Sequence, residues 1–152
     1  MKKYFLMAVA LFVGAVCFTS CGDDEIDAVK TIVNGQNSAT IKDDGNVLTL
    51  SINYANTYIE IHTATFEAAS DSAALKSYIL NQTFASSALA DAAEEGFKEL
   101  LEEDSVAYKR NGNTYTVDLT NEFKGYMKKD IRRYFNIYKE EAEEVFDEMK
   151  QL

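Results

Sequence analysis

Between Ser38 and Phe66, hydrophobic and polar residues alternate with the period of two that is typical of half-buried β-strands. The clearest run covers residues 47–54, in which the apolar set is Leu48, Leu50, Ile52 and Tyr54. The turn signal Asp43-Asp44-Gly45-Asn46 separates it from a shorter run containing Ala39 and Ile41. Residues 57–66 predict a third strand, rich in Ile, Thr, Tyr and Phe. Its apolar residues change face between Ile59/Ile61 and Ala64/Phe66, which indicates a β-bulge. Together, these runs predict a three-stranded antiparallel meander.

After residue 66 the apolar spacing changes to threes and fours, which predicts helices. Ser70 or Asp71 can cap a first short helix that contains Ala74, Leu75, Tyr78 and Ile79. A second helix is expected to begin near Ser86 or Ser87, with an apolar stripe opposite a row of acids.

The longest helical pattern is at the C-terminus. Thr120 can cap a helix over about residues 121–150, which at 1.5 Å per residue would be about 45 Å long. Its apolar stripe indicates a face packed on the core: Phe123, Met127, Ile131, Tyr134, Tyr138, Ala142, Val145, Met149 and Leu152. The part beyond Glu140 is expected either to overhang the sheet or to pair with a second copy of the chain as a homodimer.

The dipeptide Asn111-Gly112 between two β-rich runs predicts a two-residue hairpin turn, since both residues tolerate positive φ. In that register Tyr108 would face Tyr115 and Val106 would face Val117. The order of elements predicts an α+β fold, in which an antiparallel sheet made of the meander and the hairpin packs with two short helices and a long C-terminal helix.

The first 25 residues have the pattern of an export signal. Lys2 and Lys3 precede an unbroken apolar or small run from residue 4 to residue 18, followed by Ser20-Cys21 and the acidic run Gly22-Asp23-Asp24-Glu25. The apolar run has 15 residues, which is fewer than the roughly 20 needed to span a bilayer as a helix. An ordinary cleaved secretion signal and an uncleaved membrane anchor are the alternatives.

The segment Phe18-Thr19-Ser20-Cys21 resembles the lipobox of bacterial lipoproteins, and the acids after Cys21 resemble the export signal of surface-exposed lipoproteins of the Bacteroidetes group. The resemblance implies that residues 1–20 are a signal peptide and that Cys21 carries acyl chains such as palmitate in the outer membrane. The polar and acidic composition of residues 21–36 predicts a flexible tether. Each buried CH₂ adds about 0.8 kcal/mol, so several chains on one cysteine hold firmly. The resemblance does not reach residues 37–152, which we interpret as one α+β domain.

Charge and cysteine content narrow the partners. The chain has 15 basic and 25 acidic residues, and removal of residues 1–20 takes away two lysines, which leaves a net charge of −12. Nucleic acid is therefore excluded as a partner, since phosphate binding needs a basic surface. Both cysteines, Cys17 and Cys21, lie in the signal or at its end, so the domain is expected to fold without a disulfide.

Five cations gather near the start of the last predicted helix in this acidic chain: Lys124, Lys128, Lys129, Arg132 and Arg133. They form either a binding site for an anionic sugar, a phosphate or an acidic partner, or a set of charges compensated internally. The acids of residues 91–104 and 140–148 are the candidate compensating groups, within the fold or across a dimer. We favour compensation, because charge runs usually form solvated faces.

His62, the only histidine, shares a strand face with Glu60 and could exchange a proton with it. A candidate aromatic face consists of Tyr54, Tyr58, Tyr108 and Tyr115, which could stack on sugars if exposed or belong to the core if buried. The sequence has no phosphate loop, metal-binding helix or nucleophile elbow, so no cofactor, metal or catalytic residue is predicted.

These features favour a non-catalytic, lipid-anchored protein of the cell envelope that binds or scaffolds an envelope protein or glycan. The alternatives are a small glycan-acting enzyme built around Glu60 and His62, and an inhibitor-like or immunity-type interaction module.

Overall fold

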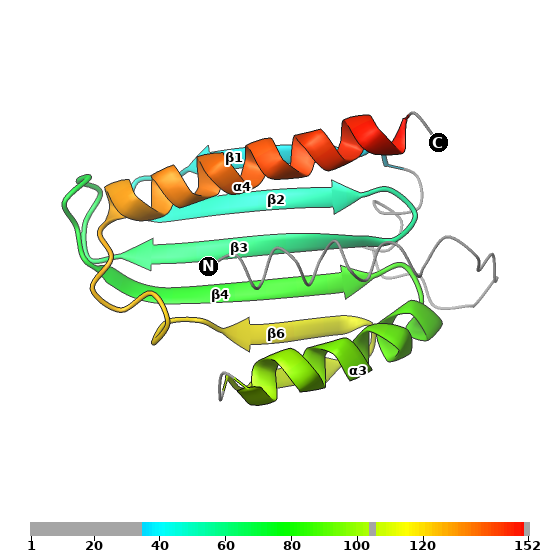
Figure 1. The fold of residues 1–152 in the computed structure, drawn as a ribbon. Helices are drawn as coiled ribbons and strands as arrows, with labels where there is room; N and C mark the ends of the chain where they lie inside the picture. Colours follow the sequence, from blue (N-terminus) through cyan, green and yellow to red (C-terminus); the bar gives the residue numbers. More distant parts are fainter. Residues whose placement is uncertain (1–34, 104–105, 151–152) are drawn as a thin grey trace.

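A computed structural model describes residues 35–103 and 106–150 of the chain. They form an α+β fold with one open six-stranded antiparallel sheet and two helices on one of its faces (Figure 1). The strand order is β1-β2-β3-β4-β6-β5. The bounds are β1 (Ser38–Asp43), β2 (Val47–Tyr54), β3 (Tyr58–Phe66), β4 (Leu75–Phe84), α3 (Ser87–Glu103), β5 (Tyr108–Asn111), β6 (Thr114–Asp118) and α4 (Lys128–Met149). The signal peptide, Cys21 and the tether up to residue 34 lie outside the described residues.

The helices cover different parts of the sheet. The long helix α4 packs on β1 and β2, while α3 packs on β4, on the same face but toward the opposite edge of the sheet (Figure 1). The strand residues beneath them are buried, and those of the opposite face are half-buried. No helix among residues 35–103 and 106–150 is long and apolar enough to cross a membrane.

The predicted strands of residues 38–66 are present. Leu48, Leu50, Ile52 and Tyr54 are at most 1% exposed, as their alternation predicts. Gly45, with φ +74°, lies in the β1–β2 turn, and Asn56, with φ +65°, lies in the β2–β3 turn. The meander continues through β4, so four consecutive strands pair as neighbours.

The predicted helix over residues 74–79 is wrong, because these residues belong to strand β4 and the preceding loop. Tyr78, Leu80, Gln82 and Phe84 point into the core, and the residues between them face the other side. Tyr78 and Ile79 lie on opposite faces of the strand, so apolar residues on both faces imitate helical spacing over this short stretch. Pairing along the whole edge of β3 satisfies the backbone of these residues, and this tertiary contact outweighs the helical spacing.

The predicted bulge in the middle of β3 is also absent. Burial alternates without interruption from Tyr58 to Phe66, so Glu60 and His62 occupy the core face, and Ile59 and Ile61 lie on the opposite face. The only register shift between β3 and β4 occurs later, between Thr65 and Phe66. The change of apolar face is thus resolved by burial of two polar side chains.

The hairpin of β5 and β6 has a different register from the predicted one. Asn111 pairs with Thr114, and Tyr108 pairs with Val117 rather than with Tyr115. Gly112, with φ +58°, is therefore the first turn residue, as in a type II′ turn. Because the shift is even, Tyr108 and Tyr115 remain on one face, with ring centroids 5.8 Å apart.

Helix α4 begins at Lys128, several residues later than predicted, and its 22 residues span about 33 Å. Gly125, at φ +90°, interrupts any helix before it, and Met127 forms a β-bridge with Ala74. Asp130 caps the helix by accepting a hydrogen bond from the Met127 amide at 3.0 Å. The C-terminal part stays on the sheet, because the Phe146 ring packs edge-on against Tyr54, with centroids 5.3 Å apart.

Helix α3 is attached to the hairpin by polar contacts. The Tyr115 hydroxyl donates to the Ala90 carbonyl at 2.8 Å, and Arg110 pairs with Glu94 at 2.7 Å and with Asp91. The Arg110 guanidinium also lies 5.4 Å from the centre of the Tyr115 ring.

Candidate functional site

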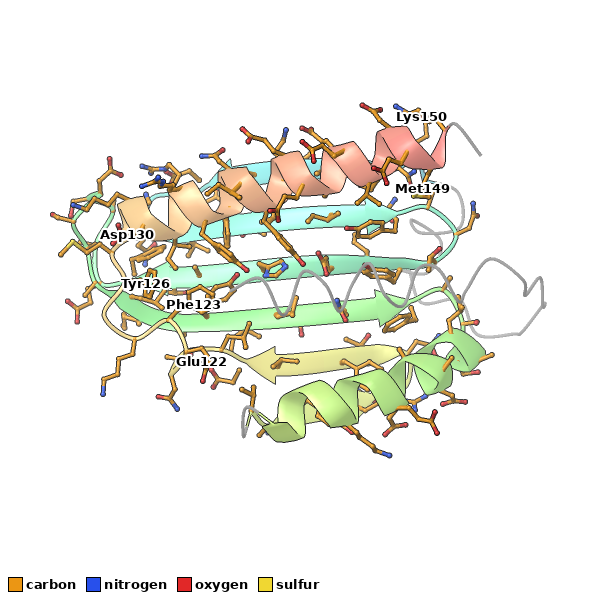
Figure 2. All side chains as sticks on the ribbon, viewed as in Figure 1. Glu122, Phe123, Tyr126, Asp130, Met149 and Lys150 are labelled. Carbon is orange, nitrogen blue, oxygen red and sulfur yellow. The ribbon has the colours of Figure 1, made fainter. Side chains whose placement is uncertain are left out.

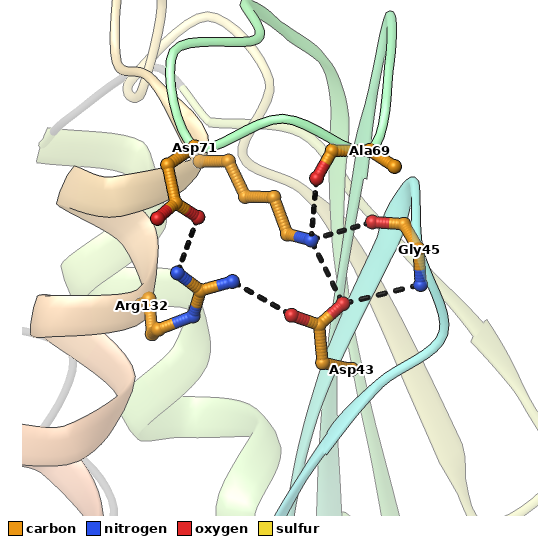
Figure 3. A network of polar contacts seen from close by, with 6 residues as sticks. Asp43, Gly45, Ala69, Asp71 and Arg132 are labelled. Carbon is orange, nitrogen blue, oxygen red and sulfur yellow. Dashed lines mark hydrogen bonds and ion pairs between the residues drawn. The ribbon is translucent and has the colours of Figure 1, made fainter.

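Two of the five clustered cations form a structural clamp at the start of α4 (Figure 3). The side chain of Lys128 is 3% exposed. Its ammonium donates to Asp43 Oδ1 at 2.8 Å, to the Gly45 carbonyl at 2.6 Å and to the Ala69 carbonyl at 3.1 Å. Lys128 therefore ties α4 to the β1–β2 turn and to the β3–β4 loop.

Arg132 extends this clamp by one helical turn. It donates to Asp43 Oδ2 at 2.6 Å and to Asp71 Oδ1 (Figure 3). These hydrogen bonds lower the pKa of the Asp43 carboxyl, with the bond from Lys128 contributing most. The acids that compensate Lys128 and Arg132 are Asp43 and Asp71. Neither belongs to the acidic runs of residues 91–104 and 140–148 that the sequence offers as compensating groups.

The other cations separate into two groups. Lys129 is exposed, whereas Lys124 and Arg133 line a shallow pocket of about 500 Å³ beside the first turns of α4. The pocket is also lined by Tyr126, Asp130, Tyr134 and Ile137. Tyr126 and Asp130 mark its position at the α4 N-terminal end in Figure 2.

The pocket wall is aromatic. The rings of Tyr126 and Tyr134 both pack on buried Phe123, with centroid distances of 5.5 and 5.3 Å. The Tyr134 ring also stacks on the buried Tyr138 ring, with centroids 5.9 Å apart. Ile137, which is 46% exposed, adds an apolar surface to the rim. Two half-buried rings are thus held in place from below.

Beneath α4, a polar cluster lies in the core on the central strands β3 and β4. We call Glu60, His62, Tyr78 and Gln82 the inner polar cluster; each is at most 3% exposed. Gln82 lies directly opposite Glu60 and donates to Glu60 Oε2 at 2.8 Å. His62 Nδ1 and the Tyr78 hydroxyl are 2.8 Å apart, and His62 Nε2 is 3.7 Å from Glu60 Oε1.

Aromatic rings surround this cluster. The ring of His62 meets Tyr138 and Phe135 edge-on, with centroids 5.1 and 6.0 Å away. Burial, reinforced by the nearby Glu60 carboxylate, raises the pKa of the Tyr58 and Tyr138 hydroxyls well above 10. These tyrosines are therefore neutral phenols and not phenolates.

The four tyrosines of the candidate aromatic face share one face of the sheet. Tyr54, Tyr58 and Tyr115 are at most 1% exposed and belong to the core, and Tyr108 is half-buried against it. The rings of Tyr54 and Tyr58 stack, with centroids 4.6 Å apart. None of these three buried rings offers a surface on which a sugar could stack.

Ring packing connects the inner polar cluster to the pocket. The Tyr138 ring meets the His62 ring edge-on and stacks on Tyr134 in the pocket wall, with centroids 5.1 and 5.9 Å apart. This contact supports the Tyr134 ring from the core. Because Glu60 and His62 are 0% and 1% exposed, they support other side chains and make no contact with a molecule in solvent.

Sequence reasoning identified Lys124 and Arg133 but missed the other groups around them. Tyr126, Asp130 and Tyr134 are predicted as ordinary helix or core residues by spacing, and only the turn at Gly125 brings Tyr126 beside α4. Gln82 was missed because no strand is predicted for its stretch, which lies between two predicted helices. Once the β3–β4 pairing is known, its position opposite Glu60 follows directly.

Comparison of the chain with protein-family models, with curated proteins and with solved structures finds no match in any of the three. Among the described residues there is also no group of three or more His, Cys, Asp or Glu side chains that could hold a metal ion.

Proposed function

We propose that this protein is a lipid-anchored component of the bacterial cell envelope whose domain binds a ligand and does not catalyse a reaction. The acyl anchor is on Cys21, and the ligand binds at the pocket lined by Lys124, Arg133 and the two tyrosines. The observation that carries the binding role is the position of this pocket relative to the point where the tether joins the domain.

The tether joins the domain beside the β2–β3 turn. Asn53, at that end of β2, donates to the Gln36 carbonyl at 3.1 Å. The pocket lies at the other end of the sheet, where Lys128 contacts the β1–β2 turn. Strand β2 has eight residues and is about 26 Å long, which separates the two ends. A domain held by its tether therefore presents the pocket on the side away from the lipid.

The net charge of the chain keeps the domain off the lipid. Its formal value of −10 opposes adsorption of the domain to an anionic lipid surface. Lys124 and Arg133 are exposed cations that have no ion-pair partner among residues 35–103 and 106–150. A local cationic pocket on an acidic, membrane-repelled domain is suited to capturing a ligand from the surrounding envelope.

A glycan-acting enzyme built on Glu60 and His62 is less well supported. General acid–base catalysis needs a side chain within hydrogen-bond reach of the substrate. Both side chains are buried beneath α4. Their hydrogen-bond partners are other core side chains, namely Tyr78 for His62 and Gln82 for Glu60.

The anchor is tested by membrane fractionation of cells that express the wild-type chain or Cys21→Ser. We expect the wild type in the outer-membrane fraction, with release only by detergent, and the serine variant in soluble fractions. Cys17→Ser is the matched control and should fractionate as the wild type. Equal membrane association of wild type and Cys21→Ser would refute the anchor.

A further inference from the structure

The pocket beside α4 has a definite charge pattern. Two cations, Lys124 and Arg133, and one carboxylate, Asp130, line it, so its lining carries a net charge of about +1. The whole chain carries −10. Unlike Lys128 and Arg132, these two cations make no ion pair within the described part of the chain. A site with a net positive lining matches a ligand with one anionic group per binding unit.

Asp130 adds a second requirement. Its Oδ2 accepts the hydrogen bond from the Met127 amide, which holds the carboxylate at the pocket as an acceptor-only group. A bare phosphate or sulfate would be repelled by this carboxylate. A ligand that carries hydroxyl donors can instead bond to it, so Asp130 selects for donors beside the anionic group.

The aromatic wall adds a third requirement. Tyr126 and Tyr134 are half-buried and line the pocket, so each ring presents part of its surface there. Phe123 supports both rings, and Tyr138 stacks on Tyr134. Such fixed rings bind flat, weakly polar surfaces at little entropic cost. The C–H face of a sugar ring is one such surface, and the volume of about 500 Å³ lies within the range of small-molecule sites.

These three requirements coincide in one chemical class. We propose that the pocket binds an acidic saccharide, a sugar that carries a single carboxylate or phosphate on each bound unit. The anionic group pairs with Lys124 and Arg133, hydroxyls donate to Asp130, and the ring packs on Tyr126 and Tyr134. This inference rests on the proposed function and names the ligand class of the same pocket.

The test is isothermal titration calorimetry of the full chain in detergent with a panel of probes. The acidic probes are digalacturonate, glucuronate, N-acetylneuraminate and glucose 6-phosphate, which separate a carboxylate from a phosphate source of the charge. The neutral probe is digalactose, and the bare anion is inorganic phosphate. We expect at least one acidic probe to bind at least tenfold more tightly than digalactose and inorganic phosphate.

The variants are Lys124→Gln and Arg133→Gln, each of which removes one cation from the pocket. Removal of a hydrogen bond to a charged group corresponds to roughly a tenfold or larger loss of affinity. Lys129→Gln is the matched control, because Lys129 is an exposed cation on α4 and does not line the pocket. It should bind within about twofold of the wild type. Asp130→Asn should reduce the ratio of the affinity for the acidic saccharide to the affinity for inorganic phosphate.

Absence of binding for all four acidic probes would overturn the inference, as would equal binding of inorganic phosphate. An equal loss of affinity in Lys124→Gln and Lys129→Gln would overturn it too, because binding would then follow overall charge. None of these outcomes affects the membrane attachment tested with Cys21→Ser, so failure of the ligand class is distinguishable from failure of the anchor.

Discussion

Replacement of the Lys128 ammonium by a methionine side chain should destabilise the domain strongly. Lys128→Met keeps an unbranched apolar stem of similar length and removes only the charged group. The lost group makes hydrogen bonds to Asp43, Gly45 and Ala69. Helix α4 would then lose the side-chain link that joins its first turn to two loops.

The magnitude follows from these contacts. Breaking a buried ion pair by removal of one partner costs roughly 3–5 kcal/mol. The Asp43 side chain is 39% exposed and keeps its bond to Arg132, so water and the guanidinium offset part of the loss. We therefore expect a loss of about 2–3 kcal/mol in the free energy of unfolding, out of a typical total of about 5–15 kcal/mol.

Urea unfolding followed by circular dichroism measures this loss. With a typical slope of about 1.5 kcal/mol per molar urea, the midpoint should fall by about 1.3–2 M. Lys129→Met removes the same charge from the neighbouring exposed position, and its stability should change by less than about 0.5 kcal/mol. Equal midpoints for Lys128→Met and Lys129→Met would refute the clamp.

Three further changes test other parts of the structure. Gln82→Leu removes the donor to Glu60 and should lower the free energy of unfolding, measured with urea, by roughly 2–4 kcal/mol. The double variant Glu60→Leu/Gln82→Leu leaves no unpaired carboxylate and should lose less stability than the single variant. A greater loss in the double variant would contradict this pairing. Gly125→Ala should cost about 1–2 kcal/mol in the same assay because of φ +90° alone, since a new Cβ would meet no atom within 4 Å; an unchanged midpoint would exclude that backbone conformation. The pKa of Asp43 is lowered in the folded state, so its contribution to stability is present above its ordinary pKa of about 4 and is lost as pH falls through the lower folded value. Asp43→Asn should therefore flatten the decline of the urea midpoint below about pH 4, and an equally steep decline would show that Asp43 does not carry it.

Alternation was a sufficient guide where only one face of a strand is apolar. In β2, Leu48 and Ile52 alternate with Thr49 and Ser51, and the predicted core face is the observed one. In β3, Ile59 and Ile61 compete with Tyr58 and Ala64 for the core. The sequence pattern alone could not decide between these faces, because the choice depends on which side α4 covers. Glu60 and His62 become core residues through that choice.

The parts of the site differ in the same way. The group of cations is visible in the sequence because Lys124 to Arg133 are close along the chain. Their separation into a clamp and a pocket is not visible, because Asp43 lies 85 residues before Lys128. Tyr126 reaches the pocket only through the turn at Gly125 that delays the start of α4. Such long-range pairings are set by tertiary structure and leave no local periodic signal.

The central claim, a domain anchored by acyl chains on Cys21, is tested most directly by the intact mass of the protein isolated from cells that produce it natively. The account predicts a chain that begins at Cys21 and carries the added mass of a diacylglyceryl group. A chain that retains residues 1–20, or one in which Cys21 has no added mass, would contradict it.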